Sequence, residues 1–337
     1  MKLLVLILAL TVGFVSCKSQ DNSKLKDLAF KVAQITIKAD TTVKSIAYLN
    51  DYLICLQDND SLIVFDTSYK RCPAIETKLN KTKIDYLFTY RDTVFLVSKN
   101  KKYFLNREFS LTLKNSEERL FSDALYNDSA YLIYGCCIGE FGGAIFFLNK
   151  HTQKTYSYMA TCATQVLKFK DAYVVCNNLA HLGRGMDFLI VKDPTKLYEL
   201  KEDSLKNFCN WYVDVDSLKD YWRTKPKVPI VAYSGSYNSM SLITFPDEDS
   251  LYSILCNDSS VVLAVHRNDS TFTKQILLSN PLNYHEAQVV CYKDQYTCLF
   301  RLTSGSPFAA YLINGNDFGL AIVKNGMINI LTRRSSK

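Results

Sequence analysis

The chain has 337 residues, and its 40 lysines and arginines against 33 acidic residues give a formal net charge of +7 at pH 7. The basic residues are dispersed, apart from Arg333, Arg334 and Lys337 near the C terminus. A nucleic-acid-binding protein gathers its positive charge into a patch or stripe, so the dispersed charge argues against a nucleic-acid partner. Beyond the N-terminal segment, the sequence has no run of the roughly 18 apolar residues that a membrane-spanning helix needs.

Residues 1–16 have the pattern of a secretory signal peptide. Lys2 supplies the positive start, and residues 3–15 form an apolar run of 13 residues. A helix that crosses the hydrocarbon core needs about 20 such residues, whereas a run of this length is typical of a signal peptide. The pattern therefore predicts export.

The signal segment ends with Phe14, Val15 and Ser16, followed by Cys17. A small residue before a cysteine resembles the lipobox of bacterial lipoproteins, in the loose form found in lipoproteins of the phylum Bacteroidota. The resemblance implies cleavage before Cys17, acylation of its thiol, and a lipid anchor in the outer membrane, on its periplasmic face or at the cell surface. Residues 17–29 are then a polar tether. The alternative is an ordinary signal peptide followed by a chance cysteine.

Residues 30–334 read as short β-strands rich in Tyr, Phe, Val and Ile, separated by polar turns. An aspartate precedes an apolar or aromatic run at intervals of 41, 36, 43, 78 and 45 residues. Asp side chains bond to the local backbone and stabilise the tight turns between strands. These aspartates are Asp51, Asp92, Asp128, Asp171, Asp249 and Asp294.

A second hairpin follows several of these positions, as residues 62–70, 145–158 and 188–200 illustrate. Two hairpins in about 40 residues give four strands per repeat, which is the blade of a β-propeller. The turn of the second hairpin is similar to that of sugar-enzyme and quinoprotein propellers, with Gln153 where glycine is usual. The sequence therefore predicts an all-β fold, a propeller of four-stranded antiparallel blades. A pair of β-sandwiches is the alternative.

Six repeats are legible, and the segment 203–237 is either a degenerate seventh blade or an insertion. We expect six blades with an insertion. The alternating strand 30–39 is expected to complete the last blade and close the ring, which removes a sheet edge. The repeats span about 41–79, 81–116, 119–160, 161–202, 238–280 and 284–334.

The chain has 11 cysteines, of which four recur at similar places in separate strand patterns, which predicts small buried hydrophobic residues. These are Cys55, Cys176, Cys256 and Cys298. Disulfides form in exported proteins, and either Cys136 or Cys137 is expected to bond to Cys162. The chain from 137 to 162 runs out along one hairpin and back to the next repeat.

Two loops depart from the repeat, residues 134–143 and 177–187. Both are expected between the second and third strands of neighbouring blades, and therefore on the same rim. They bring together an acid, a base and a cation, and this candidate rim site consists of Glu140, His181, Arg184 and Asp187. The alternative is a pair of longer hairpin loops joined by an ordinary Glu140–Arg184 ion pair. The four histidines lack metal-ligand spacing, so the sequence predicts no metal and no cofactor.

A short motif, Asp followed by Ser or Thr and then an apolar residue or Thr, recurs along the chain. It resembles the acceptor motif of the general O-glycosylation system of Bacteroidota, which implies modification of the hydroxyl. The alternative is that a turn residue followed by a strand generates the motif without any modification. The positions are Thr41, Ser61, Thr93, Ser129, Ser204, Ser217, Ser250 and Ser270.

Together these patterns predict an exported lipoprotein that presents a β-propeller as a binding or scaffold module at the cell envelope. Its partner is an envelope protein, a peptide or a glycan. The alternative is a propeller-fold hydrolase or lyase that acts on an envelope glycan or peptide through Glu140, His181 and Arg184. The recurring catalytic motifs of hydrolases and nucleotide-binding proteins do not occur in the sequence, which favours the binding module.

Overall fold

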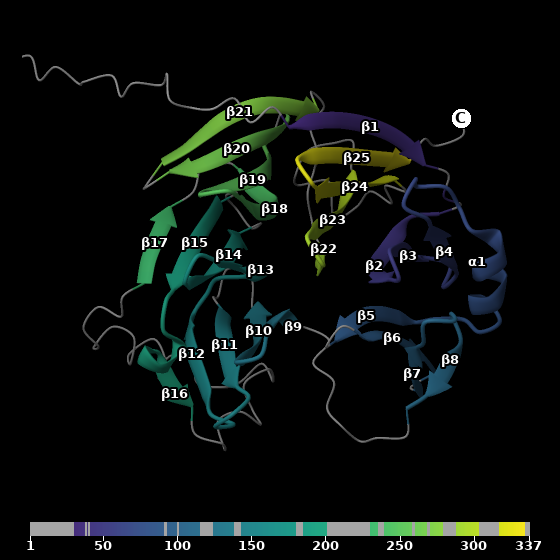
Figure 1. Cartoon of the computed structure of the whole chain (residues 1–337), viewed down its shortest axis with the longest axis horizontal. Helices are drawn as coiled ribbons and strands as arrows, with labels where there is room; N and C mark the ends of the chain where they lie inside the picture. Colours follow the sequence, from purple (N-terminus) through teal and green to yellow (C-terminus); the bar gives the residue numbers. More distant parts are fainter. Residues whose placement is uncertain are drawn as a thin grey trace, which may run out of the picture.

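A computed structural model of the chain shows six small sheets arranged as a ring around a central axis, which is a six-bladed β-propeller (Figure 1). The predicted fold class is confirmed. The structure describes residues 30–37, 39, 41–90, 93–99, 101–114, 124–137, 143–179, 185–200, 230–234, 239–257, 260–267, 270–278, 288–302 and 317–333.

The first three blades follow one another along the chain. Blade 1 contains β2 (Val43–Leu49), β3 (Tyr52–Gln57) and β4 (Leu62–Phe65), followed by the helix α1 (Pro73–Leu79). Blade 2 contains β5 (Tyr86–Tyr90), β6 (Thr93–Ser98), β7 (Lys101–Leu105) and β8 (Leu111–Leu113). Blade 3 contains β9 (Ala124–Asn127), β10 (Tyr131–Cys137), β11 (Gly143–Asn149), β12 (Thr155–Met159) and β16 (Tyr198–Leu200).

The other three blades complete the ring. Blade 4 contains β13 (Ala163–Phe169), β14 (Ala172–Leu179), β15 (Gly185–Val191) and β17 (Ile230–Ser234). Blade 5 contains β18 (Met240–Asp247), β19 (Ser250–Cys256), β20 (Val261–Arg267) and β21 (Ser270–Leu278). Blade 6 contains β22 (Gln288–Tyr292), β23 (Gln295–Leu302), β24 (Asp317–Lys324), β25 (Met327–Arg333) and β1 (Lys31–Ile37).

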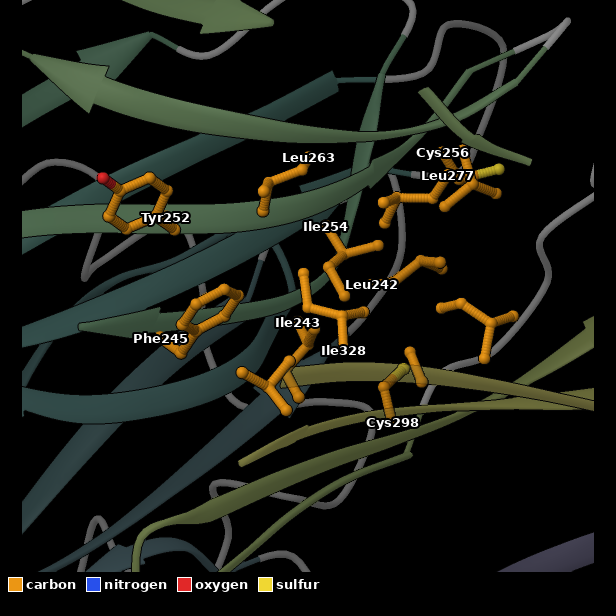
Figure 2. Packing of buried hydrophobic residues seen from close by; sticks show 14 of the residues in the cluster. Leu242, Ile243, Phe245, Tyr252, Ile254, Cys256, Leu263, Leu277, Cys298 and Ile328 are labelled. Atoms are coloured by element: carbon orange, nitrogen blue, oxygen red, sulfur yellow. The ribbon is translucent and has the colours of Figure 1, made fainter. Parts of the chain in front are cut away.

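The described hydrophobic core is divided into clusters, most of which lie between neighbouring blades. Figure 2 shows the cluster between blades 5 and 6, where Phe245 and Ile254 of one blade pack near Ile328 of the other. Successive residues of a strand point to opposite faces of the sheet, and in these blades both faces carry apolar side chains. Each blade is therefore buried against both of its neighbours and depends on the ring.

The four recurring cysteines are buried, as predicted. Each lies on the second strand of its blade, namely β3, β14, β19 or β23. Cys256 and Cys298 belong to the same cluster between blades 5 and 6 (Figure 2). Burial raises the pKa of the Cys176 thiol to about 12, so it remains protonated and packs as a small hydrophobic group.

The strand 30–39 closes the ring in a different way from the one expected. Blade 6 already has four strands, and β1 is added as a fifth strand that runs parallel to β25. The register pairs Lys31 with Met327 and Ile37 with Arg333. The expectation of purely four-stranded antiparallel blades therefore needs this correction. β1 covers the edge of β25 but becomes the outer strand of the sheet itself, so the open edge is moved and not removed as expected.

The predicted repeat 161–202 also changes, because its last strand belongs to another blade. β16 pairs with β12 of blade 3, while β17 supplies the outer strand of blade 4. The turn before β16 redirects the chain, since the Asp193 side chain accepts a hydrogen bond from Thr195 N at 3.0 Å and Pro194 begins a short 3-10 helix. The described part of 203–237 thus contributes a strand to blade 4, and residues 201–229 lie outside the described residues.

The helix α1 takes the place of a fourth strand in blade 1. Asn80 donates to Leu62 O at 2.8 Å and accepts from Leu62 N at 2.7 Å. Glu76 accepts from Val64 N at 3.1 Å, and the Cys72 N–H donates to Val64 O at 2.8 Å. These groups satisfy the open edge of β4, which is the role of a neighbouring strand.

Within the described residues, no helix is long and apolar enough to cross a membrane.

Glu76 also forms an ion pair with Arg71, whose guanidinium lies 2.6 Å from Glu76 Oε2. We expect Glu76→Ala to lower the free energy of unfolding by about 1–3 kcal/mol, because Val64 N loses its acceptor in a buried place. The exposed Lys78 of the same helix is the control, and Lys78→Ala should change stability by less than about 0.5 kcal/mol. Denaturant unfolding of the two variants is the measurement. Equal effects would show that α1 does not protect the edge of β4.

Candidate functional site on the loop rim

The two rims of the propeller are built differently. On one, which we call the turn rim, the first and second strands of each blade are joined by two or three residues. Asn50 and Asp51 both have positive φ there, as a tight hairpin turn requires. On the other, the loop rim, the second and third strands are joined by two to 14 residues. Longer, variable connections on a rigid scaffold are typical of binding surfaces.

The loop rim carries both loops that were singled out from the sequence, between β10 and β11 and between β14 and β15. Three members of the candidate rim site, Glu140, His181 and Arg184, lie outside the described residues. The fourth, Asp187, lies at the start of β15 directly opposite Asn177 of β14. The strand order therefore brings the roots of the two loops to neighbouring blades on one rim.

Asp187 and Asn177 form a half-buried polar pair. Asn177 Nδ2 donates to Asp187 Oδ1 at 2.6 Å. Burial raises the pKa of the Asp187 carboxyl, and this effect exceeds the lowering caused by the hydrogen bond from Asn177. Asn177 is 3% exposed, and its Oδ1 has no hydrogen-bond partner within the described part of the chain. The pair thus combines a buried acceptor that a ligand cannot reach with a carboxyl that protonates more readily than usual.

A disulfide joins blades 3 and 4 on the loop rim. It links Cys137 at the end of β10 to Cys162 just before β13, with the two Cα atoms 4.5 Å apart, inside the range of about 4.4–6.8 Å that bridges require. Cys136 is not part of this bridge. Adjacent strand residues point to opposite faces, so only one of the two neighbouring cysteines can face blade 4. The bridge holds the root of the loop 138–142 against the neighbouring blade.

We expect Cys137→Ala to lower the free energy of unfolding by roughly 3 kcal/mol under oxidising conditions, because the bridge closes a loop in the unfolded chain. Cys136→Ala is the matched control and should leave the bridge in place. Urea unfolding with and without reductant measures both effects. Peptide mapping without reduction is the further check, and a bridge between Cys136 and Cys162 would contradict the assignment.

On the turn rim, Asp128 crosslinks the same two blades. Its carboxylate accepts from Tyr131 N at 2.8 Å within blade 3 and from the Tyr173 hydroxyl of blade 4 at 2.7 Å. Lys168 of blade 4 lies 3.8 Å away. Burial acts to raise the pKa of Asp128, but the hydrogen bonds from Tyr131, Tyr173 and Ala130 together outweigh it, so the pKa is lowered. The seam between blades 3 and 4 is therefore fastened at both rims.

Because the pKa of Asp128 is lower in the folded protein, its ionised form stabilises the fold above its ordinary pKa of 3.8. This contribution is lost as the pH falls through the lowered pKa. We expect Asp128→Asn to be less stable than the parent at pH 7, and the difference to shrink below about pH 4. Urea unfolding from pH 7 to pH 3 tests this. Asp249→Asn is the control, since the Asp249 side chain is 96% exposed, and a constant Asp128 difference would refute the account.

Side-chain amides that bridge neighbouring blades were missed from the sequence. Gln165 of β13 accepts from Thr244 N at 2.8 Å and donates to Thr244 O at 2.6 Å. Gln288 of β22 does the same with Ile46, at 2.7 and 3.2 Å. Asn178 accepts from the N–H of Ser241 at 2.9 Å. The only sequence signal is a glutamine followed by valine near the start of a first strand, at 165–166 and 288–289.

Blade 5 contains a hydroxyl–imidazole pair that resembles a nucleophile and its base in composition alone. His266 Nε2 lies 2.7 Å from Ser253 Oγ, and Ser253 Oγ lies 2.7 Å from Thr244 Oγ1. Ser253 is 0% exposed, so a substrate has no access to its hydroxyl. Burial lowers the pKa of His266 to about 4. This chain of polar groups therefore connects the strands of blade 5 and does not form a reactive site.

The structure places six of the eight Asp-Ser/Thr positions, while Ser204 and Ser217 lie outside the described residues. Ser129 is exposed in the connection between β9 and β10. The partly exposed positions are Thr41, Ser61, Thr93 and Ser250, and Ser270 begins β21. The Ser61 hydroxyl donates to Asn59 Oδ1 at 2.6 Å, so Ser129 is the more accessible position for a glycan.

Among the described residues, no three His, Cys, Asp or Glu side chains are grouped closely enough to hold a metal.

The sequence matches no protein-family profile and no curated protein sequence. Solved structures resemble the fold at low identity. BamB from Moraxella catarrhalis has 8% identity and a TM-score of 0.32, over 78% of this chain and 71% of that chain. The computationally designed Ika8 protein has 8% identity and a TM-score of 0.38, over 88% of both chains. The Pan2 WD40 domain of Neurospora crassa has 10% identity and a TM-score of 0.36, over 88% of this chain and 81% of that chain. Likenesses this distant say nothing about function.

Proposed function

We propose that this protein is a lipid-anchored binding module of the bacterial outer membrane, and that its loop rim binds an envelope protein, peptide or glycan. The observation that carries the proposal is the fastened seam between blades 3 and 4. The disulfide from Cys137 to Cys162 holds blades 3 and 4 together on the loop rim, and the Asp128 contacts hold the same two blades together on the turn rim. A binding surface gains affinity when its loops start from a rigid frame.

The root of the tether supports one orientation of the propeller. Phe30 packs edge-to-face on Phe245 and Tyr252, with ring centroids 5.6 and 5.2 Å apart. The N–H of Lys31 donates to Gly326 O at 3.2 Å, in the turn between β24 and β25. That turn lies on the turn rim, since fourth strands begin there. A tether of 13 residues, at most about 45 Å long when extended, then leaves from the turn rim and directs the loop rim away from the membrane.

Lipid anchoring is tested by the substitution Cys17→Ser. We expect the parent to partition into the detergent phase and the variant to remain in the aqueous phase, because a serine hydroxyl is not the acylated thiol. Intact-mass measurement of both forms detects the lipid directly. Equal partitioning and an unmodified parent mass would refute the anchor and leave the binding role of the loop rim standing.

Use of the loop rim is tested by photo-crosslinking in the envelope. A photo-reactive amino acid replaces His181 on the loop rim or, as the matched control, Ser129 on the turn rim. We expect adducts from position 181 that are several-fold more abundant than from position 129, because only the loop rim binds the partner. Gel shifts and mass spectrometry measure the adducts. Equal or reversed yields at the two positions would contradict the proposed function.

A further inference from the structure

A cavity of about 610 Å³ opens on the loop rim between blades 1 and 2. Cavities of roughly 300–1,000 Å³ are the usual size of small-ligand sites. Blade 1 contributes the start of β2 and the connection between β3 and β4, and blade 2 contributes the start of β5 and the end of β6. The residues that define its chemistry are Lys44, Ser45, Asp60, Asp85, Tyr86 and Leu87.

The charged side chains of the cavity are held in place by the fold. Lys44 Nζ lies 2.6 Å from Asp60 Oδ1, and this ammonium group lowers the pKa of the Asp60 carboxyl. The Asp60 backbone is fixed by hydrogen bonds with Gln57 and Ile84. Asp85 accepts from Lys99 N at 2.7 Å through Oδ2. The walls therefore present donors and acceptors side by side, with the Lys44 and Asp60 charges compensating each other.

One further group in the lining is available to a ligand. Tyr86 is 68% exposed, while the neighbouring Leu87 is 3% exposed. An exposed aromatic ring offers a flat apolar surface. The Ser45 hydroxyl is buried, so it lies out of reach of a ligand.

We infer that this cavity binds one unit of a neutral saccharide. A pyranose ring has an apolar C–H face that fits against the Tyr86 ring. Its hydroxyls both donate and accept, so they match the Lys44–Asp60 pair and Asp85 together. Lys83 also acts electrostatically on Asp60, so two ammonium groups balance the two carboxylates at the cavity. With the charges balanced, an uncharged polyol is the better match. This inference rests on the proposed function, because it assigns a class of ligand to the loop rim.

Binding is measured on the mature chain in a detergent without a sugar headgroup, by saturation-transfer NMR and titration calorimetry. The neutral probes are chitotriose, maltotriose and xylotriose, and the charged comparators are trilysine and trigalacturonate. We expect at least one neutral trisaccharide to bind, and Tyr86→Ala to weaken it by about tenfold, which is 1.4 kcal/mol. Tyr86→Phe should retain binding because the ring remains.

The control is Ile276→Ala on β21 of blade 5, since Ile276 is 61% exposed and distant in the ring. It should bind like the parent, and circular dichroism should show that all variants are folded. Three results would overturn the inference: no binding of any neutral probe, stronger binding of trilysine or trigalacturonate, or binding that Tyr86→Ala leaves unchanged. None of them alters the crosslinking comparison of positions 181 and 129, so the two proposals fail separately.

Discussion

The ring depends on hydrogen bonds that cross from one blade to the next, because the backbone ladder ends at the edges of each sheet. Gln165 and Gln288 each bind both backbone groups of one residue in the first strand of the following blade, Thr244 and Ile46. In both cases the target residue comes just after a β-bulge, at 241–243 in β18 and at 43–45 in β2. A β-bulge changes the direction of the local backbone. In both strands, the N–H and C=O groups of the residue just after the bulge point toward the neighbouring blade.

The contacts that hold neighbouring blades together differ from one seam to the next. Between blades 3 and 4 a disulfide and a shared aspartate add to an extensive apolar cluster. Between blades 2 and 3, the cluster formed by described residues has only Phe95 and Leu132 fully buried, with partly buried neighbours around them. Local opening follows the distribution of buried contacts. Asp187, the described member of the candidate rim site, belongs to blade 4 and therefore to the better-fastened of these two seams.

Much of the fold followed from local pattern. The turn aspartates and the recurring strand cysteines predicted the blades, because a tight turn and a buried strand position leave marks within a few residues. The partner of a strand leaves no such mark. Tyr198–Leu200 reads as a strand, but whether it joins blade 3 or blade 4 depends on which outer edge is open. The helix α1 was missed for the same reason, because its hydrogen bonds to Leu62 and Val64 depend on how the helix packs along the edge of β4.

Of the candidate rim site, only Asp187 lies among the described residues. Strand order brought Asp187 to the predicted rim, yet its pairing with Asn177 depends on the register of β14 and β15. Likewise, the alternation of side chains along β10 places only Cys137 in reach of Cys162. The cavity between blades 1 and 2 had no sequence signature, because Lys44, Asp60 and Tyr86 come from separate strands and turns. Side-chain convergence of this kind is a property of the assembled ring.

Pairing β1 with β25 has a consequence for the order in which the molecule is made. A ribosome completes residues 31–37 long before residues 327–333 exist, so the first strand must wait for almost the whole chain before it finds its neighbour. Contacts between residues so far apart in sequence are slow to form, because the entropy of closing a long loop must be lost first. The ring should therefore close last, with the nascent protein passing through an open, C-shaped arrangement of blades whose terminal sheets are still exposed.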